Sequence, residues 1–171
     1  VSVELLFSTD PQYFSGIIRD FAEIEASFDG TLVYDITIVP KLWLLELNTH
    51  NRFFNGKSVV EILKDIIEPT GQTIDVLKLR SYEPRQLTTQ YDETDLAFLQ
   101  RLIAEEGISY FFQHTKSGSK LIFVDSVQSF EKSKPSRYPF VRANEPPAEN
   151  YISEFFRQER LGVGQFTSID Y

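Results

Sequence analysis

The side chains in this sequence that come nearest to a catalytic arrangement are carboxylates. One acidic cluster holds Asp92, Glu93 and Asp95, and the pair Glu105-Glu106 follows a short distance further on. Two carboxylates can divide the roles of acid and base in glycoside hydrolysis, provided that they face each other across a cleft. Neighbours in sequence on one helix do not face each other. A glycan-active or glycan-binding domain that uses the acidic cluster is therefore kept as an alternative.

Other residue types that could do chemistry are few. The two histidines, His50 and His114, have no carboxylates spaced around them as metal ligands would be, and His50 reads as part of a loop. Because cysteine is absent, disulfides, thiolate nucleophiles and cysteine-based zinc sites are excluded. We expect both histidines to be exposed polar residues. The sequence thus predicts no catalytic, cofactor-binding or metal-binding residue, no cofactor, and no enzyme.

Composition narrows the class of protein further. The 171 residues are 42% hydrophobic and 25% charged, with a net charge of −8, which is typical of a globular chain and not of a nucleic-acid binder. No apolar run approaches the roughly 20 residues that span a bilayer, and no secretory signal opens the chain. Since the sequence lacks methionine and begins at Val1, we expect it to be a segment of a longer gene product.

The elements that must position these residues begin with a β-hairpin. Residues 17–28 form an apolar-rich run, Asp29-Gly30 supplies a turn, and residues 31–39 alternate between apolar and polar side chains. Period-2 alternation on either side of an Asp-Gly pair is a strong short-range hairpin signal. Pro40 then ends the ladder, because proline has no N–H to donate.

The middle of the chain predicts two short helices and a second hairpin. Ser58 and Glu61 match a capping box, which predicts a helix that ends near Gly71. A second helix is expected to begin near Asp92 to Asp95, where acidic side chains complement the helix dipole, and to stop at Gly107. Its apolar positions, which we expect in the core, are Phe98, Leu99, Leu102 and Ile103. Strands are predicted at residues 108–114 and 121–124.

The predicted domain organisation follows from the order of these predicted elements along the chain. A proline-rich, charged connection covers residues 130–150, and residues 151–171 turn strand-like again. We expect this last stretch to pair with the first strands. Residues 1–48 and 150–171 would then form a β-barrel-like subdomain, with residues 49–149 as an inserted α+β subdomain. The predicted fold class is α+β, mainly β.

Two segments taken together resemble a known family. Residues 51–63 (NRFFNGKSVVEIL) are similar to S-R-x-F-Q-x-x-S-V-P-E-I-L, and residues 84–112 (PRQLTTQYDETDLAFLQRLIAEEGISYFF) to R-E-x-x-x-Q-Y-x-E-S-D-x-x-F-x-x-R-L-x-E-E-E-G-I-x-Y-F-F. Both stretches resemble VgrG, the Rhs-element Vgr family, which includes phage tail hub proteins. The departures, Val60, Gln86 and Ala104, touch no position to which the family assigns chemistry.

This resemblance implies a structural part of a type VI secretion system. The family's fold is that of a phage tail hub, with β-barrel-like subdomains and an inserted α+β portion. Three copies of the full-length protein form the hub of a cell-puncturing spike at the tip of a contractile tube. The implied partners are the hexameric tube protein, baseplate proteins and effector proteins, and no nucleic acid. A baseplate hub of a contractile phage or prophage tail is the alternative of the same structural class.

The resemblance also implies where the protein acts and what this segment does alone. The family is assembled in the bacterial cytoplasm and is then secreted or injected by the contractile apparatus. Because the second barrel and the spike lie outside these 171 residues, we expect the segment by itself to be largely monomeric. It should then expose an apolar patch larger than a monomer normally carries.

Overall fold

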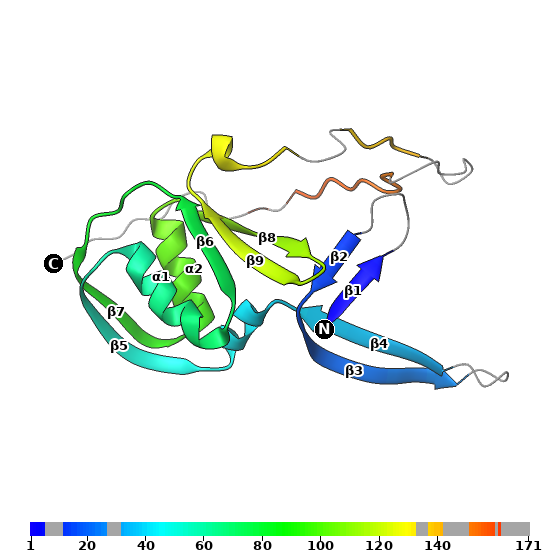
Figure 1. The fold of residues 1–171 in the computed structure, drawn as a ribbon, viewed down its shortest axis with the longest axis horizontal. Helices are drawn as coiled ribbons and strands as arrows, with labels where there is room; N and C mark the ends of the chain where they lie inside the picture. Colours follow the sequence, from blue (N-terminus) through cyan, green and yellow to red (C-terminus); the bar gives the residue numbers. More distant parts are fainter. Residues whose placement is uncertain (6–11, 27–31, 133–136, 142–150, 160, 162–171) are drawn as a thin grey trace. The chain divides into compact units, whose positions relative to one another are not determined.

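The computed structural model describes residues 1–5, 12–26, 32–132, 137–141, 151–159 and 161. The chain divides into a first unit, Val1–Glu131, and a second unit, Lys132–Tyr171. Strands predominate in the first unit, and two helices lie in its middle (Figure 1). Its strands are β1 Ser2–Leu5, β2 Gln12–Ser15, β3 Ile17–Ala26, β4 Leu32–Val39, β5 Thr49–Lys57, β6 Thr73–Lys78, β7 Arg85–Thr94, β8 Ser109–Thr115 and β9 Gly118–Val124. The helices are α1 Val59–Ile67 and α2 Asp95–Glu105, with short 3-10 turns η1 Lys41–Glu46, η2 Glu68–Thr70 and η3 Val127–Ser129.

The strands form four separate sheets. β1 pairs with β2, β3 with β4, and β5 with β7, all antiparallel, while a three-stranded sheet has the order β6-β9-β8. In that sheet β6 runs parallel to β9, and β8 runs antiparallel to it. The α+β class that the sequence predicts is confirmed. Among the described residues, no set of strands closes into a barrel.

The first hairpin is confirmed as the ribbon of β3 and β4, which extends away from the helices (Figure 1). Ile18 pairs with Ile38 and Phe21 with Ile36, and β-bulges interrupt the register between Ile18 and Asp20 and between Glu23 and Glu25. The Asp29-Gly30 turn lies outside the described residues. β4 ends at Val39, directly before Pro40, as expected for a residue that cannot continue the ladder.

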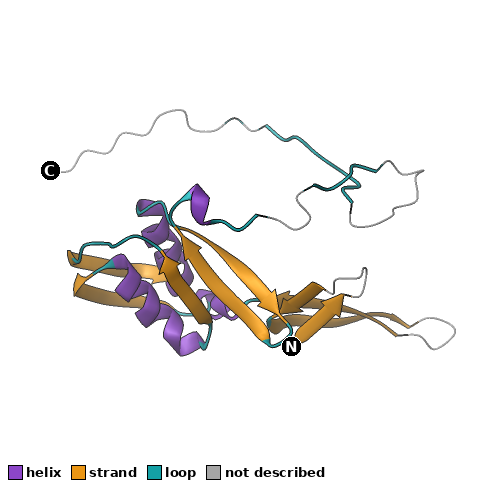
Figure 2. Cartoon of the chain, turned by 45° about the horizontal axis from the view of Figure 1, so that its top comes forward, coloured by secondary structure: helices purple, strands orange, loops and turns teal. Residues whose placement is uncertain are grey.

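The core of the first unit is built from the two helices and the sheets on either side of them. The helices lie side by side between the β5–β7 pair and the β6-β9-β8 sheet (Figure 2). Phe54 of β5 stacks on Phe98 of α2 with ring centroids 5.6 Å apart. The buried apolar residues of this core are Leu42, Leu45, Val59, Ile62, Leu63, Ile66, Ile67, Phe98, Leu99, Leu102, Ile103, Ile108, Leu121 and Phe123. All four residues predicted to face the core from the second helix are therefore buried.

Both helices begin where local side chains satisfy their first N–H groups. In α1 the Ser58 hydroxyl accepts from the Glu61 N–H, and the Glu61 carboxylate accepts from the Ser58 N–H at 2.8 Å. In α2 the Thr94 hydroxyl accepts from the Ala97 N–H at 3.1 Å. The second helix was predicted to begin near Asp92 to Asp95. It begins at Asp95, whereas Asp92 and Glu93 belong to strand β7, so the prediction is wrong for these two residues.

The second unit contains one described pairing. Phe140 and Ile152 form an isolated parallel bridge. Residues 133–136, 142–150, 160 and 162–171 lie outside the described residues, so most of the predicted proline-rich connection and of the last strand-like stretch falls there. The pairing of that stretch with the first strands, and the domain boundaries built on it, stay predictions. None of the described helices is both long and apolar enough to cross a membrane.

The capping box of α1 gives a direct test of the local structure. Ser58→Ala removes the hydroxyl that accepts from the Glu61 N–H, so the free energy of unfolding should fall by about 1 kcal/mol. Urea denaturation followed by far-UV circular dichroism measures the change. Ser81→Ala, at an exposed loop position, is the control and should change stability by less than about 0.5 kcal/mol. Equal midpoints for wild type and Ser58→Ala would contradict the role of the cap.

Candidate functional site

The β3–β4 ribbon carries a large exposed apolar surface. Its register places paired residues on the same face, and side chains two apart on one strand share that face. Phe21 stacks on Tyr34 with ring centroids 5.1 Å apart. We call this surface the ribbon face. Its members and their exposed fractions are Ile18 44%, Phe21 61%, Leu32 47%, Tyr34 43% and Ile36 45%.

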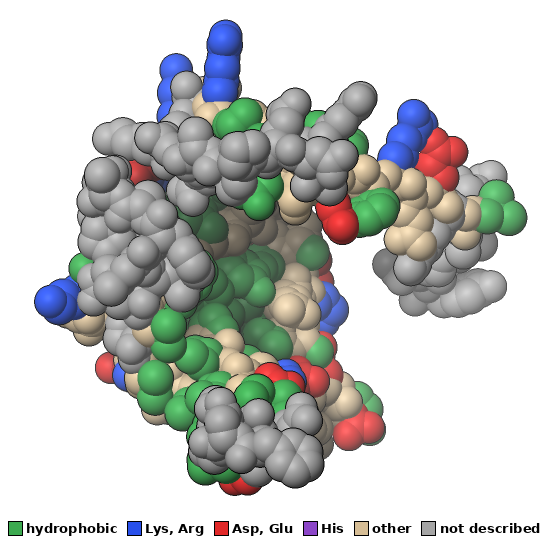
Figure 3. Space-filling view, turned by 90° about the vertical axis from the view of Figure 1, so that its right-hand side faces the viewer, with side chains coloured by type: hydrophobic (Ala, Val, Ile, Leu, Met, Phe, Trp, Pro, Cys, Tyr) green, Lys and Arg blue, Asp and Glu red, His purple; other side chains and the backbone are tan. Residues whose placement is uncertain are grey.

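The opposite face of the ribbon is more polar, although Val33, which pairs with Glu25, is 46% exposed on it. There Asp20 pairs with Thr37 and Ala22 with Asp35. The ribbon is therefore amphipathic, although no described segment of the first unit buries its apolar side. Hydrophobic side chains are numerous at the surface when the molecule is seen from the direction in which the ribbon extends (Figure 3). An uncovered apolar face of this kind is typical of a surface that packs against another chain.

The base of the ribbon is held by close packing. A Cβ added to Gly16, which lies between β2 and β3, would be only 2.3 Å from the Val39 carbonyl oxygen at the end of β4. Only glycine therefore allows the two backbones to approach so closely. Arg19 lies over the Trp43 ring of η1, with its guanidinium carbon 5.8 Å from the ring centroid. These contacts fix the point at which the ribbon leaves the rest of the first unit.

Asp95, which belongs to the acidic cluster at the expected helix start, is buried. It is 5% exposed and is the first residue of α2. Its carboxylate forms an ion pair with Arg52 and accepts from the Gln90 amide at 2.8 Å. Burial by itself raises the pKa of Asp95, but the hydrogen bonds to the carboxylate outweigh burial and leave the pKa below its usual value.

The rest of the acidic cluster does not gather around Asp95. Asp92 is exposed at the end of β7 with a φ of 49°, and its N–H donates to the Asn51 side chain at 2.8 Å. Glu93 pairs with Arg101 of α2 at 2.6 Å. The cluster is thus divided between a buried network, a surface ion pair and an exposed strand end. This arrangement is structural and offers no pair of free carboxylates.

Glu105 and Glu106 both form ion pairs with the same arginine. Arg85 at the start of β7 donates to Glu105 at 2.7 Å and to Glu106 at 2.6 Å, and Arg101 also donates to Glu105, at 3.2 Å. Burial raises the pKa of Glu105, but the two arginines outweigh burial and hold it below the usual value. A general acid needs a raised pKa. These pairs lie within the chain.

The two histidines have structural contacts. His50 is not in a loop, as the sequence suggested, but in strand β5, where its Nδ1 lies 2.9 Å from Asp95 Oδ1. His114 at the end of β8 is half-buried, and its Nδ1 accepts from the Ser15 N–H of β2 at 3.2 Å. Among the described residues, no three histidine, aspartate or glutamate side chains are grouped as a metal site would require.

Sequence reasoning missed the β5–β7 pair and its outer surface. Phe53 and Tyr91 are among the most exposed large residues of the first unit, at 71% and 77%, and Leu87 is 55% exposed. The inner face holds Phe54, Thr88 and Gln90 against the core. Alternation at residues 87, 89 and 91 could have indicated this strand. The acidic residues after it favoured a helix start instead.

The fold and the ribbon face define a strand-rich scaffold of the kind found in phage tail hubs. The E. coli c3393 protein has a similar solved structure, with a TM-score of 0.66 at 22% identity; the match covers 84% of this chain and 39% of that one. That protein is described as a component of the type VI secretion system with structural similarity to T4 bacteriophage tail proteins gp27 and gp5. At this identity the likeness shows the fold alone.

Sequence comparison gives the family. The chain is 36% identical over 129 residues to the type VI secretion system spike protein VgrG3 of Vibrio cholerae serotype O1, which covers 74% of this chain and 13% of that protein. It is 39% identical over 110 residues to the spike protein VgrG5 of Pseudomonas aeruginosa, which covers 61% of this chain and 14% of that protein. The family model of the phage tail baseplate hub (GPD) matches residues 1–171. This chain belongs to the phage tail baseplate hub family, and the resemblance to VgrG proteins is confirmed.

The buried network around Asp95 gives the second test. Asp95→Asn leaves the Arg52 guanidinium without its carboxylate, so the free energy of unfolding at pH 7 should fall by about 2–4 kcal/mol. Urea denaturation measures the loss. Asp92→Asn removes an exposed carboxylate from the same cluster and is the matched control, with an expected change under about 0.5 kcal/mol. Similar stability losses in both variants would contradict the assignment.

The same carboxylate predicts a pH dependence. Because the folded state lowers the pKa of Asp95 below its ordinary value of 3.8, its contribution to stability is complete above that value. The contribution is lost as the pH falls through the lower pKa of the folded state. The stability difference between wild type and Asp95→Asn should therefore shrink as the pH is lowered from 7 to 3. A difference that stays constant over this range would show that the charge of Asp95 does not stabilise the fold.

Proposed function

We propose that this chain is the hub portion of the trimeric spike of a type VI secretion system. It would act as a structural part at the tip of the contractile tube, and not as an enzyme. The observation that carries the proposal is the uncovered ribbon face on a chain of the tail hub family. The chain spans about one seventh of the length of VgrG3 and VgrG5, so the activity of the whole protein is part of the proposal.

The ribbon face is the proposed contact with partner chains of the trimer. A two-stranded ribbon is at best marginally stable by itself and needs further strands or a packed face to become rigid. Neighbouring hub subdomains would supply that packing by covering Phe21, Tyr34 and Ile36. In this proposal residues 1–48 and 150–171 contribute to one barrel-like subdomain, and residues 49–149 form the insertion. Obligate interfaces of this kind are rich in apolar residues.

The proposed role is mechanical. The hub would dock on the hexameric tube protein and on baseplate proteins, and it would carry effector proteins when the sheath contracts. It would assemble in the bacterial cytoplasm and leave the cell with the spike. The α+β part of the first unit suits this role, because its core is closed by layers of strands on both sides of the helices.

The electrostatics of the acidic residues weigh against the glycan-active alternative. Asp95 and Glu105 have lowered pKa values, and each accepts hydrogen bonds from arginine. They are therefore deprotonated at neutral pH and already paired, unlike a carboxyl group that donates a proton to a leaving group. A hub of a contractile phage or prophage tail remains the alternative of the same class, and it would use the ribbon face in the same way.

A further test asks whether the ribbon face assembles the hub. In the full-length protein, Phe21→Ser with Ile36→Ser should lower the fraction of trimer at least about tenfold, because two anchoring side chains are truncated. Light scattering after size exclusion measures the mass. Ala22→Ser with Thr37→Ser makes the same number of changes on the polar face and is the control. The isolated 171-residue chain should be monomeric with either pair.

A secretion assay in living cells distinguishes a type VI secretion system from a contractile phage tail. In the bacterium that encodes the protein, the ribbon-face variant should abolish release of the tube protein into the medium, while the polar-face variant releases it normally. Release of tailed particles that contain DNA, in place of free tube protein, would assign the chain to a phage tail. A full-length trimer that survives Phe21→Ser with Ile36→Ser would overturn the proposed contact.

A further inference from the structure

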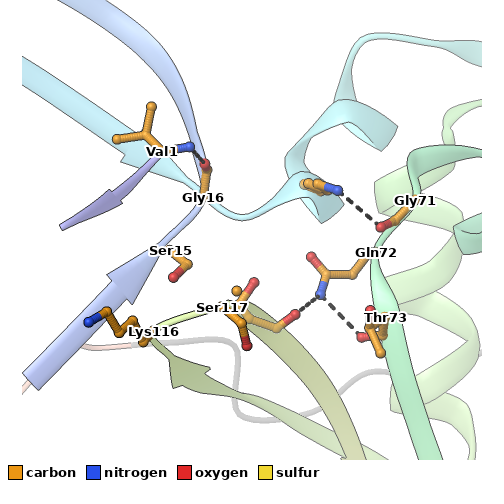
Figure 4. A pocket seen from close by; sticks show the side chains of 11 residues that line it. Val1, Ser15, Gly16, Gly71, Gln72, Thr73, Lys116 and Ser117 are labelled. Atoms are coloured by element: carbon orange, nitrogen blue, oxygen red, sulfur yellow. Dashed lines mark hydrogen bonds between the residues drawn. The ribbon is translucent and has the colours of Figure 1, made fainter. Parts of the chain in front are cut away.

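A histidine connects strand β2 to the three-stranded sheet. The Ser15 N–H at the end of β2 donates to His114 Nδ1 of β8 at 3.2 Å, and the Ser15 hydroxyl donates to the Thr115 carbonyl at 3.1 Å. Ser15 is 6% exposed, and His114 is half-buried. Figure 4 shows Ser15 at the end of β2, beside the β8–β9 turn. These two bonds join the β1–β2 hairpin to the α+β part of the first unit.

The bond from Ser15 determines the protonation state of His114. A backbone N–H can only donate, so the ring nitrogen that faces it must carry no hydrogen. The neutral imidazole with its hydrogen on Nε2 meets this condition. In the imidazolium ion both ring nitrogens are donors, so two hydrogens would face each other between Ser15 and His114. The bond therefore exists only while the imidazole of His114 is neutral.

The other groups around His114 do not titrate in the same range. The elements packed against this end of β8 are β2, β9 and the β8–β9 turn. Their titratable residues, with that of β8 itself, are Tyr13, Tyr110, Lys116 and Lys120. Lys120 and its ion-pair partner Asp75 lie on the opposite face of the sheet, because Lys120 pairs with Gln113. Histidine is the side chain whose charge normally changes between pH 5 and pH 8.

Aromatic rings, and not acids, flank the imidazole. Its centroid lies 5.7 Å from the ring of Phe14 on β2 and 6.2 Å from that of Phe112 on β8. In the described part of the chain, no carboxylate forms an ion pair with His114. The protonated ring therefore loses the Ser15 bond without gaining an anionic partner in its place.

Strand β2 leads directly into the base of the β3–β4 ribbon. Gly16 follows Ser15 and approaches Val39 so closely that it leaves no room for a side chain. A shift of Ser15 is therefore passed on to the point where the ribbon leaves the first unit. Trp43, which lies beneath Arg19 at the same base, is the single tryptophan of the chain. Its fluorescence reports on this part of the structure.

We propose that His114 is a pH-sensitive latch between β2 and the three-stranded sheet. At neutral pH the uncharged ring accepts from Ser15 and holds the β1–β2 hairpin and the base of the ribbon. In acid a proton binds to Nδ1, and this bond is lost. The bond from the Ser15 hydroxyl to Thr115 does not titrate, so the hairpin is loosened and not released. His50 behaves in the opposite way, because its protonation would strengthen the contact with Asp95.

NMR of the 15N-labelled 171-residue chain between pH 8 and pH 5 tests the latch at the atoms involved. Long-range 1H–15N spectra of the His114 ring should show hydrogen on Nε2 alone at pH 7.5 and on both nitrogens at pH 5. The Ser15 amide shift should follow the same midpoint. Its protection factor against hydrogen exchange should fall about fivefold, because one hydrogen bond is lost. A ring that is merely nearby would move the shift and leave the protection factor unchanged.

Two variants identify the titrating group. His114→Asn cannot titrate, and asparagine Oδ1 stands where Nδ1 does relative to Cβ, so it can accept from Ser15 at any pH. The Trp43 fluorescence of the wild type should change with the His114 midpoint, and this change should be absent from His114→Asn. His50→Gln removes the other histidine, is the matched control, and should keep the change. The Val1 amino group also titrates near this range, but it is present in all three chains.

Three results would overturn the proposal. The first is a neutral His114 ring with its hydrogen on Nδ1. The second is a Ser15 protection factor that is equal at pH 7.5 and pH 5. The third is a fluorescence change that persists in His114→Asn. If His114→Asn does not fold, the ring spectra and the Ser15 protection factor of the wild-type chain still decide.

Discussion

The carboxylate of Asp95 is the interaction on which the α+β part of this fold depends. It meets Arg52 and His50 of β5 and Gln90 of β7 at the first turn of α2, while the Asp95 N–H donates to the Asn48 carbonyl at 3.0 Å. A buried charge is costly unless its partners are all present. The carboxylate therefore has all of its partners only when the two strands are paired in this register. One residue thus couples local structure at a helix end to the pairing of two strands far apart in sequence.

The two long ribbons of the first unit differ in what supports them. The β5–β7 pair has one face on the helices, where Phe54 stacks on Phe98, and it is tied to α2 by the Asp95 network. Among the described residues, the close contacts of the β3–β4 pair with the rest of the first unit include those at its base, at Gly16 and between Arg19 and Trp43. Beyond that base its apolar side chains remain exposed. The first pair is stabilised within the chain, whereas the described part of the first unit leaves the ribbon face of the second pair exposed.

Local signals in the sequence predicted local structure well. The Ser58–Glu61 capping box, the apolar spacing of α2 and the alternation in β4 each depend on residues a few positions apart, and each is found in the structure. The family and the hub-like fold came from the similarity of residues 51–63 and 84–112 to known sequences. Composition and periodicity alone would have given only a globular α+β chain.

The wrong predictions share one physical cause. A pattern of neighbouring residues does not show which residues far apart in the sequence contact each other in the fold. The sequence predicted a loop at His50, because the polar residues that follow it obscure the alternating pattern of strand β5. Its partner Asp95 is 45 residues away in the sequence. The burial of Asp95 was not expected, because a carboxylate is normally solvated. Glu105 and Glu106 are satisfied by Arg85, which belongs to a strand that the sequence did not indicate. Buried polar networks and ion pairs between elements therefore had to come from the structure.

The geometry of the ribbon favours packing through its face over pairing through its edges. Bulges at Arg19 and between Glu23 and Glu25 interrupt the ladder and increase its twist, which discourages the addition of foreign strands. The net charge of −8 also opposes non-specific association. An exposed apolar surface is a liability that these features limit without removing it, because the ribbon face itself is left uncovered. A chain that protects its strand edges and still exposes Phe21 and Ile36 is suited to a partner that recognises the shape of that face.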